Sequence, residues 1–502
     1  MTAPPRIPPD HLVLTAANDA QADGYRLELD ARRRSGQLPP TTAAHVVTDL
    51  GGRRVGSGGS TLLVFKYLAE LLATGGSLRD AFGGKRIFLL HAGGDSKRLP
   101  AYAAQGKLFT PLPTPAPAGQ VPTLFDLLLA NLERLPRPKD GHLLIAAGDV
   151  LLTFNPAEAD FSQPGVTGVA YADHTDRAAR HGVYVADAQG GVLDFLQKPN
   201  VDELRRRGAL DRLGRALVDT GLMSFDPDAV ERFCTAAGLA TQDGRIALEP
   251  GLLADIVEGA AGEIDLYEEI ALALPRRANA KEYRQRVLDR PRNVDARQQE
   301  RLLAFFQAVH GTPFHVRTVS HCDFFHVGTS RELLAGLAER NRTSTTYGFK
   351  NRTRTLLPDE LRDGSPAFIF NSALESDRFR AGPATLVEGA DLRCPLDLAG
   401  RNIVTGVPGG VTKPLALPEG VGLLMLPIRP DGWATVLYGI DDDFGQPSSS
   451  GLSTFLHVPL EDFLRQHHLM AGLRWPQEPA SVYQAKLWPV AAPDEEIGRA
   501  HV

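Results

Sequence analysis

A Gly-rich turn followed by basic side chains stands between Phe88 and Pro113. Gly93 and Gly94 come directly after an apolar run that is typical of a buried parallel strand. Because glycine has no Cβ, backbone N–H groups at such a turn can approach phosphate oxygens closely. The polar and basic residues that follow are Ser96, Lys97, Arg98 and Lys107. A Gly-Gly pair alone also ends ordinary strands. Together with these cations it predicts a clamp for a nucleoside triphosphate, in which Arg98 and Lys107 are catalytic and the other residues bind the nucleotide.

A second Gly-rich stretch precedes a predicted helix at Thr61–Thr74. Helix N-termini favour anions, so Gly56, Ser57, Gly58 and Gly59 are further candidate nucleotide-binding residues. The stretch lacks the Gly-Lys-Ser/Thr ending of a Walker loop. A mobile crossover or lid explains the same glycines equally well, and both interpretations stay open.

A carboxylate stands at the end of another predicted strand. The apolar run His142–Ala147 leads into Gly148 and Asp149. Open α/β sheets bind ligands at the carboxyl ends of their strands, and Mg²⁺ is commonly held by one or two carboxylates together with substrate phosphates. An aspartate in an ordinary turn is the alternative. Beside a triphosphate clamp, we interpret Asp149 as a magnesium ligand.

The spelling His-Ala-Gly-Gly-Asp-Ser-Lys-Arg-Leu-Pro from His91 resembles the GDP-fucose pyrophosphorylase family, within the sugar-1-phosphate nucleotidyltransferases. The same family occurs fused ahead of the kinase in bifunctional fucokinases. The superfamily pattern is Gly-Gly-x-Gly-Thr-Arg-Leu with a later Pro-Lys, and here Asp95, Ser96 and Lys97 replace the x-Gly-Thr portion. We expect this departure to change the path of the loop and to bring a carboxylate towards the phosphates.

The resemblance implies roles for residues further along the chain. Gln197-Lys198-Pro199 is similar to a Glu-Lys-Pro turn, which makes Lys198 a catalytic lysine directed at the sugar phosphate. Asp219 and Gly221 match an Asn/Asp-x-Gly segment that contacts the sugar. His326 takes the position of a metal-binding aspartate, and because imidazole is a poor Mg²⁺ ligand we assign it to the sugar or its phosphate. A core histidine with no contact to substrate is the alternative. Asp265 is then a weak candidate for the second metal carboxylate.

The activity implied by the resemblance is transfer of a nucleotide to a sugar 1-phosphate, with Mg²⁺ as cofactor and pyrophosphate as product. The expected substrates are GTP and L-fucose 1-phosphate, whereas the residues themselves indicate only a triphosphate and an anion site. A UDP-sugar or other NDP-sugar pyrophosphorylase is the nearer alternative. A non-catalytic nucleotide or sugar-nucleotide sensor is the other, favoured by the unusual Asp95 loop and His326.

Composition limits the class of protein. The formal charge of −6 over 502 residues argues against wholesale nucleic-acid binding. No apolar stretch approaches the roughly 20 residues of a membrane span, and the N-terminus lacks an apolar signal region. The three cysteines are far apart, which fits buried thiols in a reducing compartment. We therefore expect a cytoplasmic protein that acts on small molecules.

Strand and helix patterns alternate through the first half, which predicts a doubly wound, parallel α/β sheet of the Rossmann-like nucleotidyltransferase type. Leu386, Leu392, Leu398 and Val404 recur every six residues, the period of a left-handed parallel β-helix. The expected domains are a nucleotidyltransferase core at 1–275, a helical insertion and return to the sheet at 276–375, and a β-helix with a C-terminal β domain at 376–502. In similar enzymes β-helices mediate self-association, so a homo-oligomer is expected.

Overall fold

The structure is a computed structural model that describes residues 4–73, 75–117, 119–288, 295–339, 341–358, 366–375, 378–430, 432–469, 481–485, 487–488 and 490–492. The chain divides into two units, each built from separate stretches. Unit 1 consists of Met1–Gly94, Leu128–Gly148 and Leu152–Cys322, and unit 2 consists of Asp95–Leu127, Asp149–Leu151 and Asp323–Val502. The domains predicted at 1–275, 276–375 and 376–502 follow chain order, whereas these units interleave.

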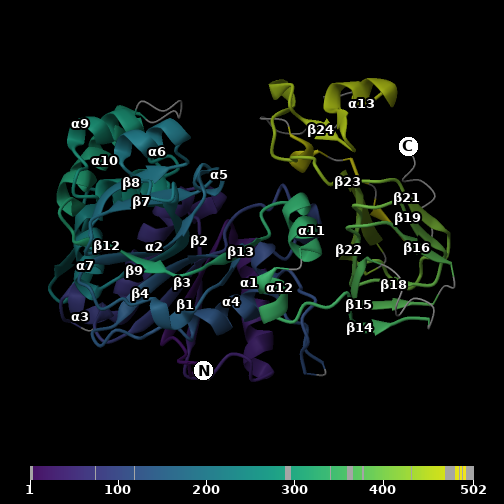
Figure 1. The fold of residues 1–502 in the computed structure, drawn as a ribbon, viewed down its shortest axis with the longest axis horizontal. Coiled ribbons are helices and arrows are strands. Elements are labelled where there is room, and N and C mark those ends of the chain that lie inside the picture. Colours follow the sequence, from purple (N-terminus) through teal and green to yellow (C-terminus); the bar gives the residue numbers. More distant parts are fainter. Residues whose placement is uncertain are drawn as a thin grey trace. The chain divides into compact units, whose positions relative to one another are not determined.

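Unit 1 is built around a nine-stranded mixed sheet (Figure 1). In spatial order its strands are β12 (Phe314–Val319), β6 (Val166–Asp173), β9 (Ala216–Phe225), β4 (His142–Ala147), β3 (Arg86–His91), β1 (His11–Ala16) and β2 (Ala43–Thr48), with β7 (Gly182–Ala186) on β9 and β8 (Val192–Gln197) on β7. Strands β2, β1, β3 and β4 are parallel, as predicted. The all-parallel prediction is wrong for β9, which runs antiparallel to both β4 and β6.

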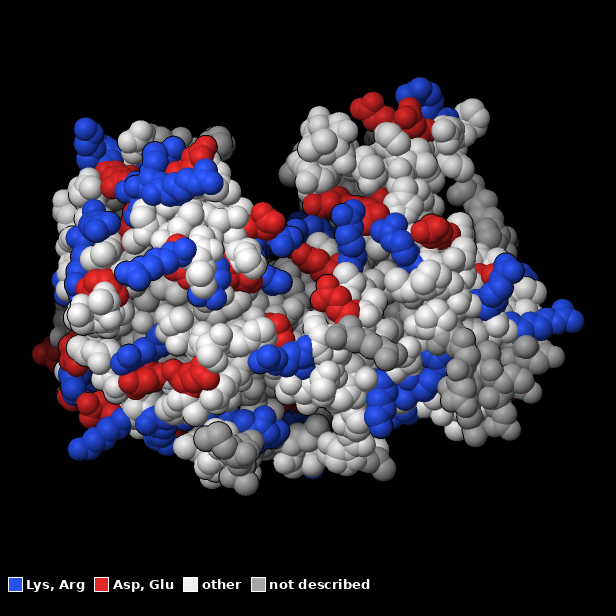
Figure 2. Space-filling view, viewed as in Figure 1, with Lys and Arg blue, Asp and Glu red and all other residues white. Residues whose placement is uncertain are grey.

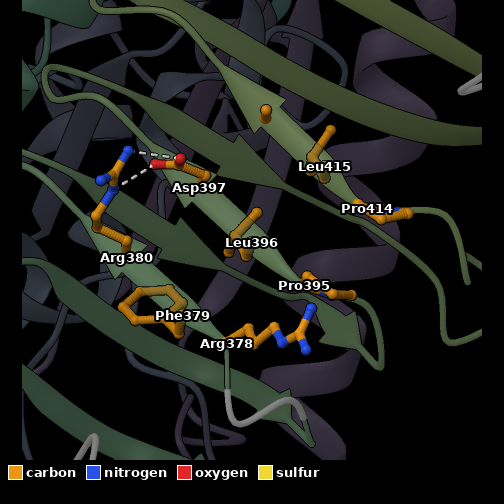
Figure 3. Close-up of a pocket in the computed structure, with 9 residues that line it drawn as sticks. Arg378, Phe379, Arg380, Pro395, Leu396, Asp397, Pro414 and Leu415 are labelled. Atoms are coloured by element: carbon orange, nitrogen blue, oxygen red, sulfur yellow. Dashed lines mark hydrogen bonds and ion pairs between the residues drawn. The ribbon is translucent and has the colours of Figure 1, made fainter.

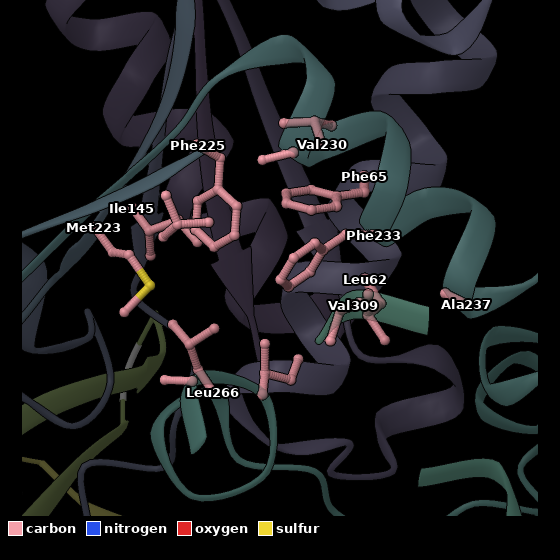
Figure 4. Close-up of a cluster of buried hydrophobic side chains, with 14 of the residues drawn as sticks. Leu62, Phe65, Ile145, Met223, Phe225, Val230, Phe233, Ala237, Leu266 and Val309 are labelled. Carbon is pink, nitrogen blue, oxygen red and sulfur yellow. The ribbon is translucent and has the colours of Figure 1, made fainter. Parts of the chain in front are cut away.

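Strand β3 is buried on both faces, which explains its continuous apolar run. Ile87 and Leu89 join the main core of unit 1, while the alternate residues Phe88 and Leu90 are equally buried and point to the opposite face. The main core also joins distant segments, because Phe65 and Phe233 both pack edge to face on Phe225 of β9, with ring centroids 5.9 Å and 5.2 Å away (Figure 4).

Side-chain caps fix where several helices begin. Asn18, Asp226 and Thr329 each accept a hydrogen bond from the backbone N–H of the residue three positions further on. The longer helices are α1 (Asp19–Arg34), α2 (Gly56–Leu72), α4 (Leu124–Leu132), α6 (Val201–Arg207), α7 (Pro227–Ala237), α8 (Leu252–Glu258), α10 (Ala296–Val309), α11 (Ser330–Ala338) and α13 (Leu460–Gln466). Helix α2 therefore starts five residues before the predicted Thr61, and includes the second Gly-rich stretch.

Unit 2 contains two sheets in which most neighbouring strands are parallel. The larger consists of β14 (Arg352–Leu356), β15 (Phe368–Leu374), β17 (Leu386–Glu388), β20 (Ile403–Thr405), β22 (Val421–Arg429), β23 (Gly432–Gly439) and β26 (Val490–Ala491), with β18 (Asp391–Leu392) on β15. The smaller consists of β16 (Phe379–Ala381), β19 (Leu396–Leu398) and β21 (Leu415–Leu417). The last three strands of the larger sheet pair antiparallel.

The parallel part of unit 2 repeats a coil of nearly constant length. Paired positions in the larger sheet are Phe368, Leu386, Ile403 and Gly422, which lie 18, 17 and 19 residues apart. Residues with left-handed backbone recur at the same interval, because Arg354, Asn371, Gly389 and Gly406 all have φ between 51° and 70°. Each coil therefore turns a corner at an equivalent position, and the stack begins at β14, before the predicted residue 376.

Three of the four residues of the six-residue repeat face one core. Leu392, Leu398 and Val404 are buried with Leu396 and Leu423 in the interior of the coil. Leu386 is buried in a different core, because its neighbour Val387 takes the inward position of β17. The repeat therefore marks buried residues correctly but is one residue out of phase at its start.

No helix in the described part of the chain has the length and apolar character needed to cross a membrane. On the face drawn in Figure 2, basic and acidic side chains are interspersed rather than separated into one basic surface. The cysteines Cys234, Cys322 and Cys394 are buried free thiols, as expected.

Replacing Gly422 by alanine is expected to destabilise unit 2. A Cβ at this position would overlap the ring of Tyr438, which is completely buried and cannot move aside. We expect a loss of roughly 1–3 kcal/mol, measured as a lower urea midpoint. Gly24→Ala in the exposed middle of α1 is the control, since a Cβ there meets no atom within 4 Å and a gain of about 0.5 kcal/mol is expected. Equal midpoints for both variants would contradict this packing.

Candidate functional site

The strand order of unit 1 creates a switch point at the carboxyl ends of β1 and β3. After β1 the chain forms β2 on one side of β1, and it then forms β3 on the other side. Such points bind ligands in open α/β sheets. Gly93 and Gly94 follow β3 here, as predicted. Thr15 at the end of β1 accepts hydrogen bonds from the N–H groups of Ala92 and Gly93, both at 3.1 Å. The path of the turn is thus fixed by β1.

Two side chains of α1 also hold this turn, and sequence reasoning missed both. Gln21 donates to the carbonyl of Gly94 at 3.0 Å and accepts the N–H of Ala17 at 2.7 Å. Tyr25 donates to the carbonyl of Ala92 at 2.8 Å. The sequence signal for Gln21 is its position three residues after Asn18, the cap of α1, which closely follows the end of β1.

The glycines at the start of α2 serve close packing. A Cβ on Gly56 would overlap the carbonyl of Ile264. The N–H groups of Gly58 and Gly59 donate to that same carbonyl, at 2.8 Å and 3.2 Å. Ser57 donates to Asp265 at 3.2 Å and accepts the N–H of Leu266 at 2.8 Å. These contacts account for Gly56, Ser57, Gly58 and Gly59 within the fold, and their nucleotide-binding role stays a prediction.

Asp265 acts as a helix cap. One carboxylate oxygen accepts the N–H groups of Tyr267 and Glu268, at 2.8 Å and 2.9 Å, and the other accepts the hydroxyl of Ser57. Both oxygens are therefore already used in local hydrogen bonds. These contacts account for Asp265 within the fold, and its role as the second magnesium carboxylate stays a prediction.

Asp219, Thr220 and Gly221 form a bulge in β9. Gly168 of β6 pairs with Met223 of β9 and Ala170 pairs with Asp219, so a step of two residues on β6 corresponds to four on β9. Within this bulge the hydroxyl of Thr220 donates to the carbonyl of Val169 at 2.8 Å. Gly221 has φ of 78°, which favours glycine. Bulges of this kind redirect side chains next to functional sites.

The carboxyl of Asp219 is buried beside Tyr184, whose hydroxyl donates to it at 3.0 Å. Burial raises the pKa of Asp219 to about 7, although the hydrogen bonds from Gly221, Tyr184 and Thr220 act in the opposite direction. The group therefore changes charge near neutral pH, and its contact with the sugar stays a prediction.

Lys198 has a left-handed backbone, with φ of 48°, directly before Pro199. Its N–H donates to the carbonyl of His181 at 3.0 Å, and Asn200 caps α6 immediately afterwards. A non-glycine residue in this conformation costs about 1–3 kcal/mol and is kept only where its surroundings determine it. The turn therefore holds the backbone of an exposed lysine at a defined point of unit 1.

In unit 2, Asp149 lies between two basic side chains. Its Oδ2 is 3.5 Å from the Nζ of Lys107 and 3.4 Å from the Nε2 of His326. Lys107 opens a short 3₁₀ helix, Lys107–Phe109, after Gly106 with φ of 79°. His326 ends β13 (Asp323–His326), and the next N–H, that of Val327, donates to the carbonyl of Asp149 at 2.9 Å. The predicted residues Lys107, Asp149 and His326 are thus brought together.

Glu332 completes this cluster, and sequence reasoning missed it. Its Oε2 is 3.3 Å from the Nδ1 of His326, and it accepts the hydroxyl of Thr329 at 3.2 Å in the first turn of α11. Burial favours neutral imidazole, but the bonds and charges of Asp149 and Glu332 outweigh it and raise the pKa of His326 to about 9. The Thr-x-x-Glu spacing of a capping box was the available signal.

Asp149 itself stays ionised. Burial alone would raise the pKa of its carboxyl, but hydrogen bonds and charge from His326 and Lys107 hold that pKa well below its usual range. The described residues contain no group of three His, Cys, Asp or Glu side chains placed to hold a metal ion by themselves. Asp149 fits Mg²⁺ as a single carboxylate that shares the ion with substrate phosphates.

The segment that follows the Gly-Gly turn belongs to unit 2. Lys97 forms an ion pair with Asp95 at 2.9 Å, so the carboxylate that we expected near the phosphates is neutralised by its own loop. Ser96 is buried with φ of 52°. The carbonyl of Arg98 accepts the N–H of Ser330 at 2.9 Å, and Arg98 is an exposed residue. The nucleotide contacts of Ser96, Lys97 and Arg98 stay predictions.

A groove of about 290 Å³ runs along β16, β19 and β21 in unit 2 (Figure 3). Arg380 and Asp397 on its rim form a two-point ion pair at 2.9 Å and 2.7 Å. The groove contains none of the predicted residues, and this pair neutralises its own charge. We assign it no catalytic role.

Comparison with known proteins gives a consistent result. Residues 79–493 match the family described as the Fucose pyrophosphorylase domain, which is more than half of the 502 residues.

Individual relatives agree with that match. The chain is 34% identical over 301 residues to the bifunctional fucokinase/GDP-fucose pyrophosphorylase of Arabidopsis thaliana, covering 54% of this chain and 27% of that protein. It is 26% identical over 460 residues to the fucose-1-phosphate guanylyltransferase of Mus musculus, covering 86% and 74%. It is also 25% identical over 434 residues to the L-fucokinase/L-fucose-1-P guanylyltransferase of Bacteroides fragilis, covering 84% and 40%.

Asp219→Asn is expected to remove a pH dependence of stability. The pKa of Asp219 is about 7 in the fold, against about 4 for an unfolded carboxyl. Between these pH values the folded protein holds a proton that the unfolded chain has lost, so the free energy of unfolding falls as pH rises, by roughly 4 kcal/mol at most. Urea midpoints at pH 5 and pH 8 should separate in the wild type and converge in the variant. Asp30→Asn on the exposed face of α1 is the control, and the same pH slope in Asp219→Asn and wild type would refute the assignment.

Proposed function

Since the chain belongs to the fucose pyrophosphorylase family, we propose that it converts fucose 1-phosphate and GTP to GDP-fucose and pyrophosphate. The names of the mouse and Bacteroides relatives support the guanylyl and fucose parts of this proposal. The observation that carries it is the cluster in unit 2, where Lys107 and His326 flank an ionised Asp149. Such an arrangement suits a reaction between two anions.

The proposed reaction needs no covalent enzyme intermediate. An oxygen of the sugar phosphate forms a bond to the α-phosphorus of GTP, and the bond from that phosphorus to the bridging oxygen breaks. The electron pair leaves with pyrophosphate. Because the phosphate oxygen is already a nucleophile, catalysis reduces to holding two anions in line and neutralising their charge.

Within this proposal Lys107 and Arg98 would bind the triphosphate, and Lys198 would bind the incoming sugar phosphate. The strained backbone of Lys198 and the bulge that carries Asp219 and Gly221 support a substrate role for both segments. Asp149 would hold Mg²⁺, which when bound neutralises phosphate charge. His326 would keep a positive charge beside the same carboxylate oxygen, from where it would attract a phosphate oxygen.

The direct test is pyrophosphate release in the presence of Mg²⁺ from each common NTP, paired with a panel of sugar 1-phosphates. Release confined to GTP with L-fucose 1-phosphate is the expected result. Release with another pair would keep the chemistry and change the substrates. Binding of GTP without release from any pair would contradict catalysis and favour a nucleotide sensor.

Lys107→Ala is expected to lose most activity while staying folded. Removing one preorganised cation from the reacting phosphates should lower kcat/KM on the order of 10²- to 10³-fold, measured by pyrophosphate release. Lys66→Ala is the matched control, because Lys66 lies in α2 and forms an ion pair within the same helix with Glu70 at 2.7 Å. Circular dichroism would confirm the fold of both, and near-normal turnover in Lys107→Ala would remove the centre of the proposal.

We also propose that the coil of unit 2 is a left-handed parallel β-helix, that it supports self-association, and that the protein acts in the cytoplasm. The repeat lengths near 18 residues and the recurring left-handed corners support the first part, since three six-residue sides make one coil. Size-exclusion chromatography with light scattering would test the second, and a monomeric mass at all concentrations would contradict it.

A further inference from the structure

The loop of unit 2 that follows the Gly-Gly turn contains an acidic residue where an anion is to bind. Asp95 is only 19% exposed, and its Oδ2 lies 2.9 Å from the Nζ of Lys97. Ser96 between them has φ of 52°, and its carbonyl accepts the N–H of Leu99 at 2.8 Å. The loop therefore holds a defined, strained conformation in which the two charged side chains meet.

Lys97 has a second partner from a distant part of the chain. Its Nζ lies 4.9 Å from the centre of the ring of Tyr483, a distance at which an ammonium is attracted to an aromatic face. The aliphatic part of Lys97 passes over Gly445, where an added Cβ would come within 2.9 Å of its Cδ. Gly445 thus leaves the room that lets the lysine reach both Asp95 and Tyr483.

Tyr483 is held in place by its own neighbours. The preceding residue, Val482, is completely buried in a core of unit 2. The N–H of Tyr483 donates to the carbonyl of Phe444 at 3.0 Å, and Ser481 forms a bridge with Pro447. Tyr483 as a whole is 42% exposed, so its backbone is anchored while part of the residue stays accessible to solvent.

We propose that Tyr483 is a positioning residue for nucleotide binding, which keeps Lys97 against Asp95 so that the loop meets a triphosphate without an uncompensated negative charge. The inference rests on the proposed function, and it assigns the segment at 481–485 a part in the affinity for the nucleotide. Lys97 then acts by neutralising Asp95 rather than by contacting a phosphate.

Electrostatics supports this role. A free carboxylate a few ångströms from a polyphosphate repels it, and the repulsion is strong where water is partly excluded. A cation held by both a carboxylate and an aromatic ring stays in place more firmly than one held by the carboxylate alone. The wider superfamily pattern has threonine at the position of Lys97 and leaves the position of Asp95 unspecified, so the ion pair of Asp95 with Lys97 accompanies the lysine of this loop.

The test is a double-mutant cycle on GTP binding with Mg²⁺, measured by isothermal titration calorimetry. Tyr483→Ala should raise the Kd for GTP about threefold to tenfold. Tyr483→Phe keeps the ring and should bind as the wild type does. In the Asp95→Asn background, which has no carboxylate charge to neutralise, Tyr483→Ala should change the Kd less than about twofold. Tyr67→Ala in unit 1 is the control for loss of an exposed tyrosine and should leave the Kd unchanged.

A second cycle separates the two possible roles of Lys97. If Lys97 neutralises Asp95, Asp95→Asn should restore the affinity that Lys97→Ala removes. An equal loss with and without Asp95 would show that Lys97 contacts phosphate directly and would overturn the inference, as would an equal effect of Tyr483→Ala in both backgrounds. If the wild type bound none of the common NTPs, the proposed function would fail together with this inference. If GTP bound and the effects of Tyr483→Ala and Lys97→Ala on its Kd were the same in the Asp95→Asn background as in the wild-type background, this inference alone would be refuted.

Discussion

One carboxylate shared by two cations is the constraint around which the proposed site is arranged. Asp149 accepts Lys107 and His326 on the same oxygen, at 3.5 Å and 3.4 Å, and remains ionised because of them. The reaction joins two anions, so charge must be compensated before the phosphorus and oxygen can approach. Glu332 adds a second negative partner for His326. It contacts the Nδ1 of the ring, and this contact keeps the Nε2 directed at Asp149.

The backbone around the predicted residues is held by hydrogen bonds of side-chain and backbone groups that have no proposed part in the reaction. In unit 1, Thr15 and Gln21 fix the turn after β3, and the bulge at Thr220 fixes the segment at Asp219. In unit 2, Val327 ties the end of β13 to Asp149. Preorganisation of this kind keeps functional groups in place without relying on substrate to order them.

The sequence predicts the local elements and the residues with an unusual chemical neighbourhood. The buried run of β3 and the position of Asp149 after β4 follow from short-range patterns. The proximity of Lys107 to Asp149 joins residues 42 apart, and it is expected because both are assigned to one phosphate site. The local spacing marks Glu332, Gln21 and Asp265 as residues at helix starts, but the contacts of Glu332 with His326, of Gln21 with Gly94 and of Asp265 with Ser57 depend on which distant segments meet. The glycines of the stretch at 56–59 show a similar limit. Close packing on Ile264 and phosphate binding both favour glycine, so the sequence alone does not distinguish the two roles. The reversed direction of β9 is likewise a property of the topology and not of its own residues.

The charge on His326 is the most direct test, because the account requires a cation where the superfamily pattern has an aspartate. Among the 14 histidines, the ring of His326 can be identified in ¹⁵N-labelled, metal-free protein by the signals that disappear in His326→Gln. We expect both ring nitrogens to be still protonated at pH 8, since the pKa of His326 is about 9. A neutral ring at pH 7 would contradict it, because Asp149 would then have lost one of its two cationic partners.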